Sequence, residues 1–87
     1  MNILFIGDVM GRPGRKAVAR HLPDLRRELQ LDVVIANGEN LAAGAGLTHD
    51  TAGELFAAGV DLLTGGNHLF DKSDGHGFIA REERVVR

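Results

Sequence analysis

Short apolar runs alternate along the chain with segments that have helical spacing. The first run spans Ile3 to Ile6, the second spans Val33 to Ala36, and the third spans Val60 to Thr64. Continuous runs rich in β-branched residues are typical of parallel strands that are covered on both faces. The pattern therefore predicts three parallel strands, with a helix between each strand and the next.

The two intervening segments carry helix signals of different kinds. In the first, apolar residues recur at i, i+4, i+7 and i+11, namely Val18, Leu22, Leu25 and Leu29. Pro23 should bend this helix or restart it near Leu22. In the second, Thr51 and Glu54 have capping-box spacing and Gly59 is a plausible C-terminal cap. The order β-α-β-α-β predicts an α/β parallel-sheet unit with right-handed crossovers.

Composition narrows the class of protein. The chain has 87 residues, 44% of them hydrophobic, which suits one small globular domain with a thin core. It has no cysteine, which excludes disulfides and thiolate metal sites. The net charge of -2 argues against dedicated nucleic-acid binding. We interpret the basic residues of the first helix as a solvated surface: Arg12, Arg15, Lys16, Arg20, Arg26 and Arg27.

The two ends of the chain carry weaker signals. The stretch MNILFIGD is too short for a signal peptide or a membrane span, so we expect a cytoplasmic protein without a membrane partner. Residues 73–87 form a tail of uncertain structure that includes a short apolar pair.

Polar residues collect directly after the three predicted strands, where an open parallel sheet binds its ligands. They are Asp8, Asn37, Glu39, Asn40, Asn67, His68 and Asp71. Carboxylates with amides and one imidazole suit manganese, iron or zinc better than a calcium cage. A carboxylate such as Glu39 can bridge two cations, and two cations can activate a water for phosphoryl displacement. An imidazole that is not a ligand could protonate the leaving alkoxide.

Plainer interpretations stay open for each of these residues. Asp8 could cap a helix or form a turn, and NGEN could be only a turn. Asn67 and His68 could form an Asx-turn with a surface histidine, and we assign no site role to His21, His49 or His76. The glycine loop after the first strand matches neither the dinucleotide fingerprint nor the P-loop, which argues against a Rossmann half.

Taken together, FIGDVMGRPG, IANGEN, AAGAGL and GNHLFDK resemble the YmdB-like branch of the calcineurin-like metallophosphoesterases, from Met1 to about Lys72. The resemblance implies a sandwich of two sheets flanked by helices, of which this chain is the first part. It also implies a dinuclear iron or manganese centre that hydrolyses phosphodiesters, notably 2′,3′-cyclic nucleotides. Carried over residue by residue, Asp8 would bind one metal, Glu39 would bridge both and Asn40 would contact the first. Asn67 would bind the second metal, and His68 would donate the proton.

Length is the main departure from the family, whose members are considerably longer and draw further metal-binding histidines from their later part. We therefore expect residues 1–87 to be a single, incomplete metallophosphoesterase domain with little or no turnover alone. The alternative is a non-catalytic α/β module that binds a metal or phosphate and assembles with a partner or as a homo-oligomer.

Overall fold

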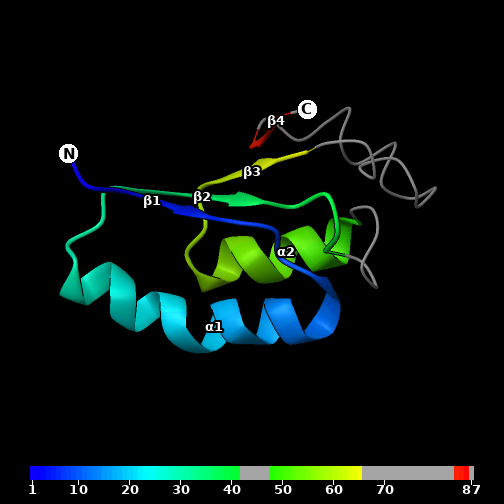
Figure 1. Ribbon diagram of the computed structural model, residues 1–87, viewed down its shortest axis with the longest axis horizontal. Coiled ribbons are helices and arrows are strands. Elements are labelled where there is room, and N and C mark those ends of the chain that lie inside the picture. The colour runs from blue at the N-terminus through cyan, green and yellow to red at the C-terminus, as the bar shows by residue number, and fades with distance from the viewer. Residues whose placement is uncertain (42–47, 66–83, 87) are drawn as a thin grey trace.

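The computed structural model of the protein describes residues 1–41, 48–65 and 84–86 (Figure 1). Their elements are β1 (Ile3–Ile6), α1 (Gly11–Glu28), β2 (Val33–Asn37), α2 (His49–Ala58), β3 (Leu62–Thr64) and β4 (Val85–Val86). These strands form one parallel sheet in the order β1-β2-β3-β4. The predicted α/β class and the β-α-β-α-β order are confirmed, and the apolar pair of the tail supplies β4.

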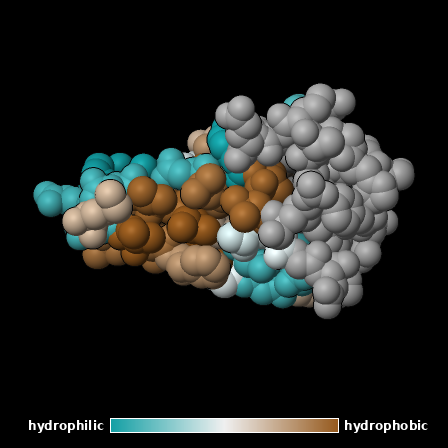
Figure 2. Space-filling view, turned by 90° about the horizontal axis from the view of Figure 1, so that it is seen from above, coloured by the Kyte–Doolittle hydropathy of each residue, from teal (hydrophilic) through white to brown (hydrophobic). Residues whose placement is uncertain are grey.

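Both helices lie on the same face of the sheet (Figure 1). This follows from the topology, because successive neighbouring strands joined by right-handed crossovers place their helices on one side. The prediction that the strands are covered on both faces is therefore wrong for β1. Ile3 is 58% exposed and Phe5 is 60% exposed. Register pairs Phe5 with Ile35, and Ile35 with Leu62, so the same face continues as an apolar surface across the sheet (Figure 2).

The core lies between the sheet and the two helices. In each strand, every second side chain points toward the helices and enters the core. Each helix contributes the side chains that face the sheet. The members that are no more than 8% exposed include Val18, Leu22, Val34, Ala36, Ala52, Leu55 and Leu63. Arg84, directly before β4, stacks its guanidinium over the Phe56 ring at 3.8 Å from the centroid, which ties β4 to α2.

Helix α1 departs from its predicted form in two respects. It is one continuous helix from Gly11 to Glu28 that includes Pro23, so the predicted restart does not occur. Only half of its predicted apolar face is buried, because Leu25 is 38% exposed and Leu29 is 51% exposed. Leu25 lines an apolar groove of about 360 Å³ between α1 and β1, and β1 is an outermost strand of the described sheet.

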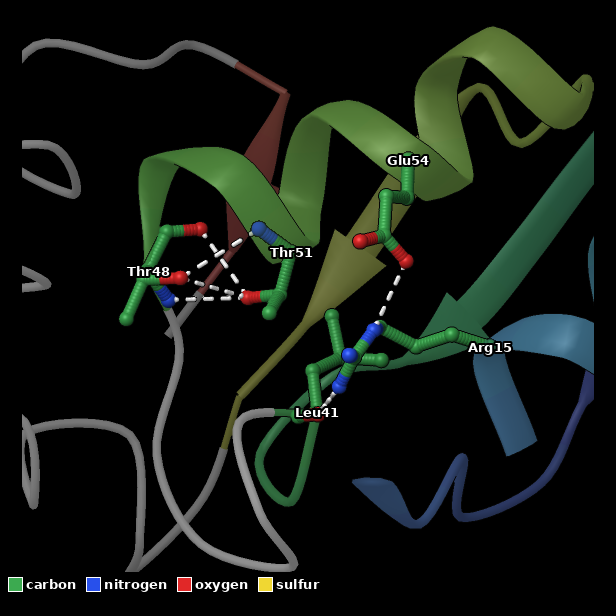
Figure 3. Close-up of polar contacts among 5 residues, drawn as sticks. All are labelled: Arg15, Leu41, Thr48, Thr51 and Glu54. Carbon is green, nitrogen blue, oxygen red and sulfur yellow. Dashed lines mark hydrogen bonds and ion pairs between the residues drawn. The ribbon is translucent and has the colours of Figure 1, made fainter. Parts of the chain in front are cut away.

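Helix α2 begins earlier than its predicted cap. Thr48 is the N-cap, and its hydroxyl accepts from the Thr51 backbone N–H at 3.2 Å while the Thr51 hydroxyl accepts from the Thr48 N–H at 3.1 Å (Figure 3). The predicted capping box of Thr51 and Glu54 is therefore wrong. The observed capping box consists of Thr48 and Thr51, with Thr51 as its second member. His49 is the first residue of the helix, and Gly59 is the C-cap.

Within the described part of the chain, no helix combines the length and apolar character needed to cross a membrane.

Candidate functional site

The carboxyl edge of the sheet is where the candidate site residues gather. Strands β1 and β2 end at this edge, and both helices begin there (Figure 1). The loop after β2 is fixed to the neighbouring strand, because the Gly38 N–H donates to the Thr64 carbonyl at 2.7 Å. Helix N-termini carry partial positive charge, so this edge also favours anionic groups.

Asp8 and Asn40 meet at this edge, as the sequence predicts. The Asn40 side-chain Nδ2 donates to both carboxylate oxygens of Asp8, at 2.9 Å and 3.0 Å. Asn40 is only 8% exposed, whereas Asp8 is exposed to solvent. The capping interpretation of Asp8 is wrong, because the N-cap of α1 is Met10 and makes no side-chain cap bond.

The backbone of the turn that carries Asn40 is held on two sides. Its carbonyl accepts from the Gly11 N–H at 2.9 Å, at the first residue of α1. Gly11 has a φ of 53°, a left-handed conformation that favours glycine. On the other side, a Cβ on Gly38 would lie only 3.2 Å from Leu41 Cδ1, so any larger residue there requires the Leu41 side chain to move. Residues 38–41 do form a turn, closed by a bond of 3.4 Å from the Leu41 N–H to the Gly38 carbonyl.

Glu39 lies between Gly38 and Asn40 in this turn and is half-buried. Its backbone N–H donates to Asn37 Oδ1 at 3.3 Å, an Asx-type contact that orients the start of the turn. The structure therefore places Asp8, Glu39 and Asn40 at one edge. Asn67, His68 and Asp71 lie outside the described residues.

The described donor set fits part of a metal site. It offers the two carboxylates of Asp8 and Glu39 and the side-chain oxygen of Asn40, which are hard oxygen ligands that suit Mn²⁺. Within residues 1–41, 48–65 and 84–86, no cluster of three or more His, Cys, Asp or Glu residues is close enough to hold an ion. The described residues can therefore start a cation site but do not complete one.

Two arginines of α1 have structural roles that the sequence analysis missed. Arg15 Nε donates to Glu54 Oε2 at 2.7 Å, and its Nη1 donates to the Leu41 carbonyl at 2.6 Å (Figure 3). Arg26 Nη1 donates to the Gly59 carbonyl at 2.7 Å. The interpretation of these two residues as solvated surface is wrong. Their spacing of 11 residues gave a signal, since it equals about three helical turns and places both on one helix face.

Arg26 also pairs with Asp61, whose Oδ2 lies 2.8 Å from Nη1. The same oxygen accepts from the Val34 backbone N–H at 2.8 Å. Burial raises the pKa of Asp61, but the hydrogen bonds from Arg26 and Val34 and the charge of Arg26 outweigh it. The pKa of Asp61 is therefore lower than its usual value.

Comparison with protein families matches residues 4–87 to a family described as YmdB-like protein. A curated relative, the 2′,3′-cyclic-nucleotide 2′-phosphodiesterase of Bacillus subtilis (strain 168), is 44% identical over 87 residues. That alignment covers 100% of this chain and 33% of the relative, so this chain spans about a third of that relative's length.

Solved structures give the same picture of the fold. The crystal structure of a hypothetical protein from Thermus thermophilus matches with a TM-score of 0.92 and 49% identity. The match covers 100% of this chain and 33% of that one. A crystal structure of a novel phosphatase from Mycoplasma pneumoniae matches with a TM-score of 0.93 and 34% identity, over 98% of this chain and 30% of that one.

Proposed function

The chain belongs to the YmdB-like family, and from this premise we propose that it is part of a metal-dependent phosphodiesterase. The proposed substrates are small phosphodiesters, in particular 2′,3′-cyclic nucleotides, as the name of the Bacillus subtilis relative suggests. The proposed cofactors are two divalent cations, manganese or iron. A cytoplasmic location and the treatment of residues 1–87 as one incomplete domain belong to the same proposal.

The observation that supports this function best is the contact between Asp8 and Asn40. These residues lie 32 positions apart in the chain and follow different strands, yet they form a two-oxygen contact at the carboxyl edge of the sheet. The exposed Asp8 carboxylate is available to a cation, while the buried Asn40 holds its orientation. An edge that presents oriented oxygen donors to solvent is suited to metal binding.

Each residue has a separate role in the proposal. Asp8 would supply negative charge to hold one cation, and Glu39 would be a ligand of both. Asn40 now directs its N–H group toward Asp8, so ligation by Asn40 requires its carboxamide to present Oδ1 to the cation instead. The bound cations would supply Lewis acidity and an activated water. Asn67 would add a ligand and His68 would protonate the leaving oxygen.

A chimera tests this proposal despite the length of the chain. The chain replaces the matched third of the Bacillus subtilis relative, and hydrolysis of 2′,3′-cyclic AMP is followed with added Mn²⁺. We expect turnover in the chimera and little or none from the 87-residue chain alone. Asp8→Asn and His68→Ala should each abolish hydrolysis by the chimera.

The matched control is Asp24→Asn, the same chemical change on the exposed surface of α1, where Asp24 pairs with Arg27. This variant should keep full turnover, because a surface ion pair contributes little to stability. A folded chimera without hydrolysis, or full activity after Asp8→Asn, contradicts the proposed function.

The uncovered sheet face favours a second candidate function, a non-catalytic module that assembles with a partner. Ile3 and Phe5 expose more than half of their surface on that face, and exposed apolar surface of this kind marks interaction sites. Sedimentation equilibrium discriminates between the candidates. A stable monomer at high concentration contradicts the assembly module and leaves the phosphodiesterase proposal intact.

A further inference from the structure

Arg15 connects three separate elements at the carboxyl edge of the sheet. Its guanidinium extends from the first turns of α1, donates to Glu54 on α2, and donates to the carbonyl of Leu41 in the turn after β2 (Figure 3). The Arg15 side chain is only 14% exposed. Leu41 is fully buried, so water replaces a lost hydrogen bond at its carbonyl poorly, whereas the Glu54 side chain is 52% exposed.

Two consecutive carbonyls of the turn are thus held by α1. The Asn40 carbonyl accepts from the Gly11 N–H, and the Leu41 carbonyl accepts from Arg15. Asp8 lies on the segment that leads into the same helix, and its carboxylate accepts a hydrogen bond from the Asn40 side chain. The relative position of the two candidate ligands is therefore set by contacts to one rigid element.

Arg26 makes the same kind of contact at the far end of α1. It joins a backbone carbonyl, that of Gly59, to a carboxylate, that of Asp61. The spacing from Arg15 gives about 16 Å along the helix axis and the same helix face. Arg26 therefore makes the same two kinds of hydrogen bond as Arg15, to a backbone carbonyl and to a carboxylate, but lies far from the candidate site.

From this arrangement we propose that Arg15 is a positioning residue of the candidate metal site. It fixes the Leu41 carbonyl and, through it, the orientation of Asn40 and Glu39 relative to Asp8. The effect of Arg15 on metal binding rests on the proposed metal-dependent function. Its effect on the orientation of the turn rests only on the contacts of Arg15. The carboxylate of Glu54 balances the guanidinium charge, so Arg15 adds little net repulsion toward a cation.

Lysine is the informative replacement because it keeps the charge and loses the geometry. The planar guanidinium donates to Leu41 and Glu54 at the same time from two different nitrogens. A lysine ammonium is a point charge without this fixed fork. Arg15→Lys and Arg26→Lys are therefore matched variants, with equal chemical change at opposite ends of one helix.

The first readout is NMR of the 87-residue chain without metal. In Arg15→Lys, the side-chain amide signals of Asn40 should shift, and exchange of the Gly11 amide hydrogen should accelerate by about tenfold, as expected for one lost charge-assisted hydrogen bond. Arg26→Lys should leave both signals at their wild-type values, although it should lower thermal stability to a similar degree.

The second readout is Mn²⁺ affinity. Arg15→Lys should weaken it by about tenfold, at the low end of the effect of residues that orient metal ligands, whereas Arg26→Lys should not change it. Unchanged Asn40 signals in Arg15→Lys, or equal changes in both variants, would overturn the positioning role.

The two proposals fail in distinguishable ways. If the unmodified chain binds no Mn²⁺, the metal proposal is refuted, and the Asn40 signals still decide whether Arg15 positions the turn. If Arg15→Lys does not fold, Glu54→Gln replaces it, because this change removes the charge that orients the guanidinium. A shift of the Asn40 signals in Glu54→Gln supports the role of Arg15, and unchanged signals overturn it.

Discussion

Replacing Asn40 by aspartate places two carboxylates where the structure has a carboxylate and an amide. The Asn40 Nδ2 lies 2.9 Å and 3.0 Å from the oxygens of Asp8, so in Asn40→Asp an oxygen takes the position of the donor. The size and shape of the side chain hardly change. The variant therefore isolates the electrostatic part of the contact.

The expected cost follows from the distance and the environment. Two unit charges about 3 Å apart repel by about 1.4 kcal/mol at a dielectric constant of 80 and about 5.5 kcal/mol at 20. Because Asp8 is exposed, the repulsion lies nearer to the lower value. With the lost charge-assisted hydrogen bond, we expect Asn40→Asp to lower the free energy of unfolding by about 2–4 kcal/mol at pH 7.

The loss of stability in Asn40→Asp should grow as the pH rises. Two carboxylates in contact hold one proton more tightly when the chain is folded, so the folded pKa of the pair is raised above the unfolded value of about 3.9. The shared proton therefore stabilises the folded variant below about pH 4. This stabilisation is lost as the pH rises through the raised pKa. The deficit should therefore be small near pH 4 and full at pH 7.

Urea denaturation followed by circular dichroism at several pH values measures this deficit. The control is Asn37→Asp, which adds the same charge at the last residue of β2 while keeping an acceptor for the Glu39 N–H. It should cost well under 1 kcal/mol, as is usual for substitutions outside a close contact. A deficit in Asn40→Asp that does not change between pH 4 and pH 8 would refute the contact between residues 8 and 40.

Three further predictions concern the packing of the core, the ion pair between Arg26 and Asp61, and the turn after β2. Leu22→Ala should cost about 2–5 kcal/mol in urea denaturation because Leu22 is 1% exposed, whereas Leu29→Ala, at a half-exposed position, should cost well under 1 kcal/mol. Asp61→Asn should cost about 0.5–1 kcal/mol at pH 7, because Asp61 and its partner Arg26 are partly exposed. The folded pKa of Asp61 lies below its unfolded value, so this difference should be full above about pH 4 and should be lost as the pH falls further, through the folded pKa; a constant difference would contradict the assignment. Gly38→Ala should destabilise the chain by about 1–3 kcal/mol through overpacking against the buried turn, and a neutral result would contradict the tight packing at that position.

The sequence predicted the sheet well because its signal is local. Each strand is a short apolar run, and the crossovers leave little choice of topology. The uncovered face of β1 was not predictable from Ile3 and Phe5, because an apolar run reads the same whether or not a second layer is present. The start of α2 was misplaced for a similar reason, since Thr48 and Thr51 both have capping residue types.

The candidate site was predictable only as a location. Asp8, Glu39 and Asn40 follow strands of a parallel sheet, and such positions meet at one edge. The role of Arg15 was not predictable in the same way, because a basic residue on a helix is most often solvated. Its contacts to Leu41 and Glu54 depend on how α1 packs against α2 and the turn, which requires tertiary structure.

The most direct test of a cation site at Asp8 and Asn40 is a Mn²⁺ titration of the 87-residue chain, followed by the electron paramagnetic resonance signal of free Mn²⁺. We predict weak but saturable binding that falls by about tenfold or more in Asp8→Asn and is unchanged in Asp24→Asn. Equal binding by the chain and by both variants, or no binding by any of them, would contradict the account.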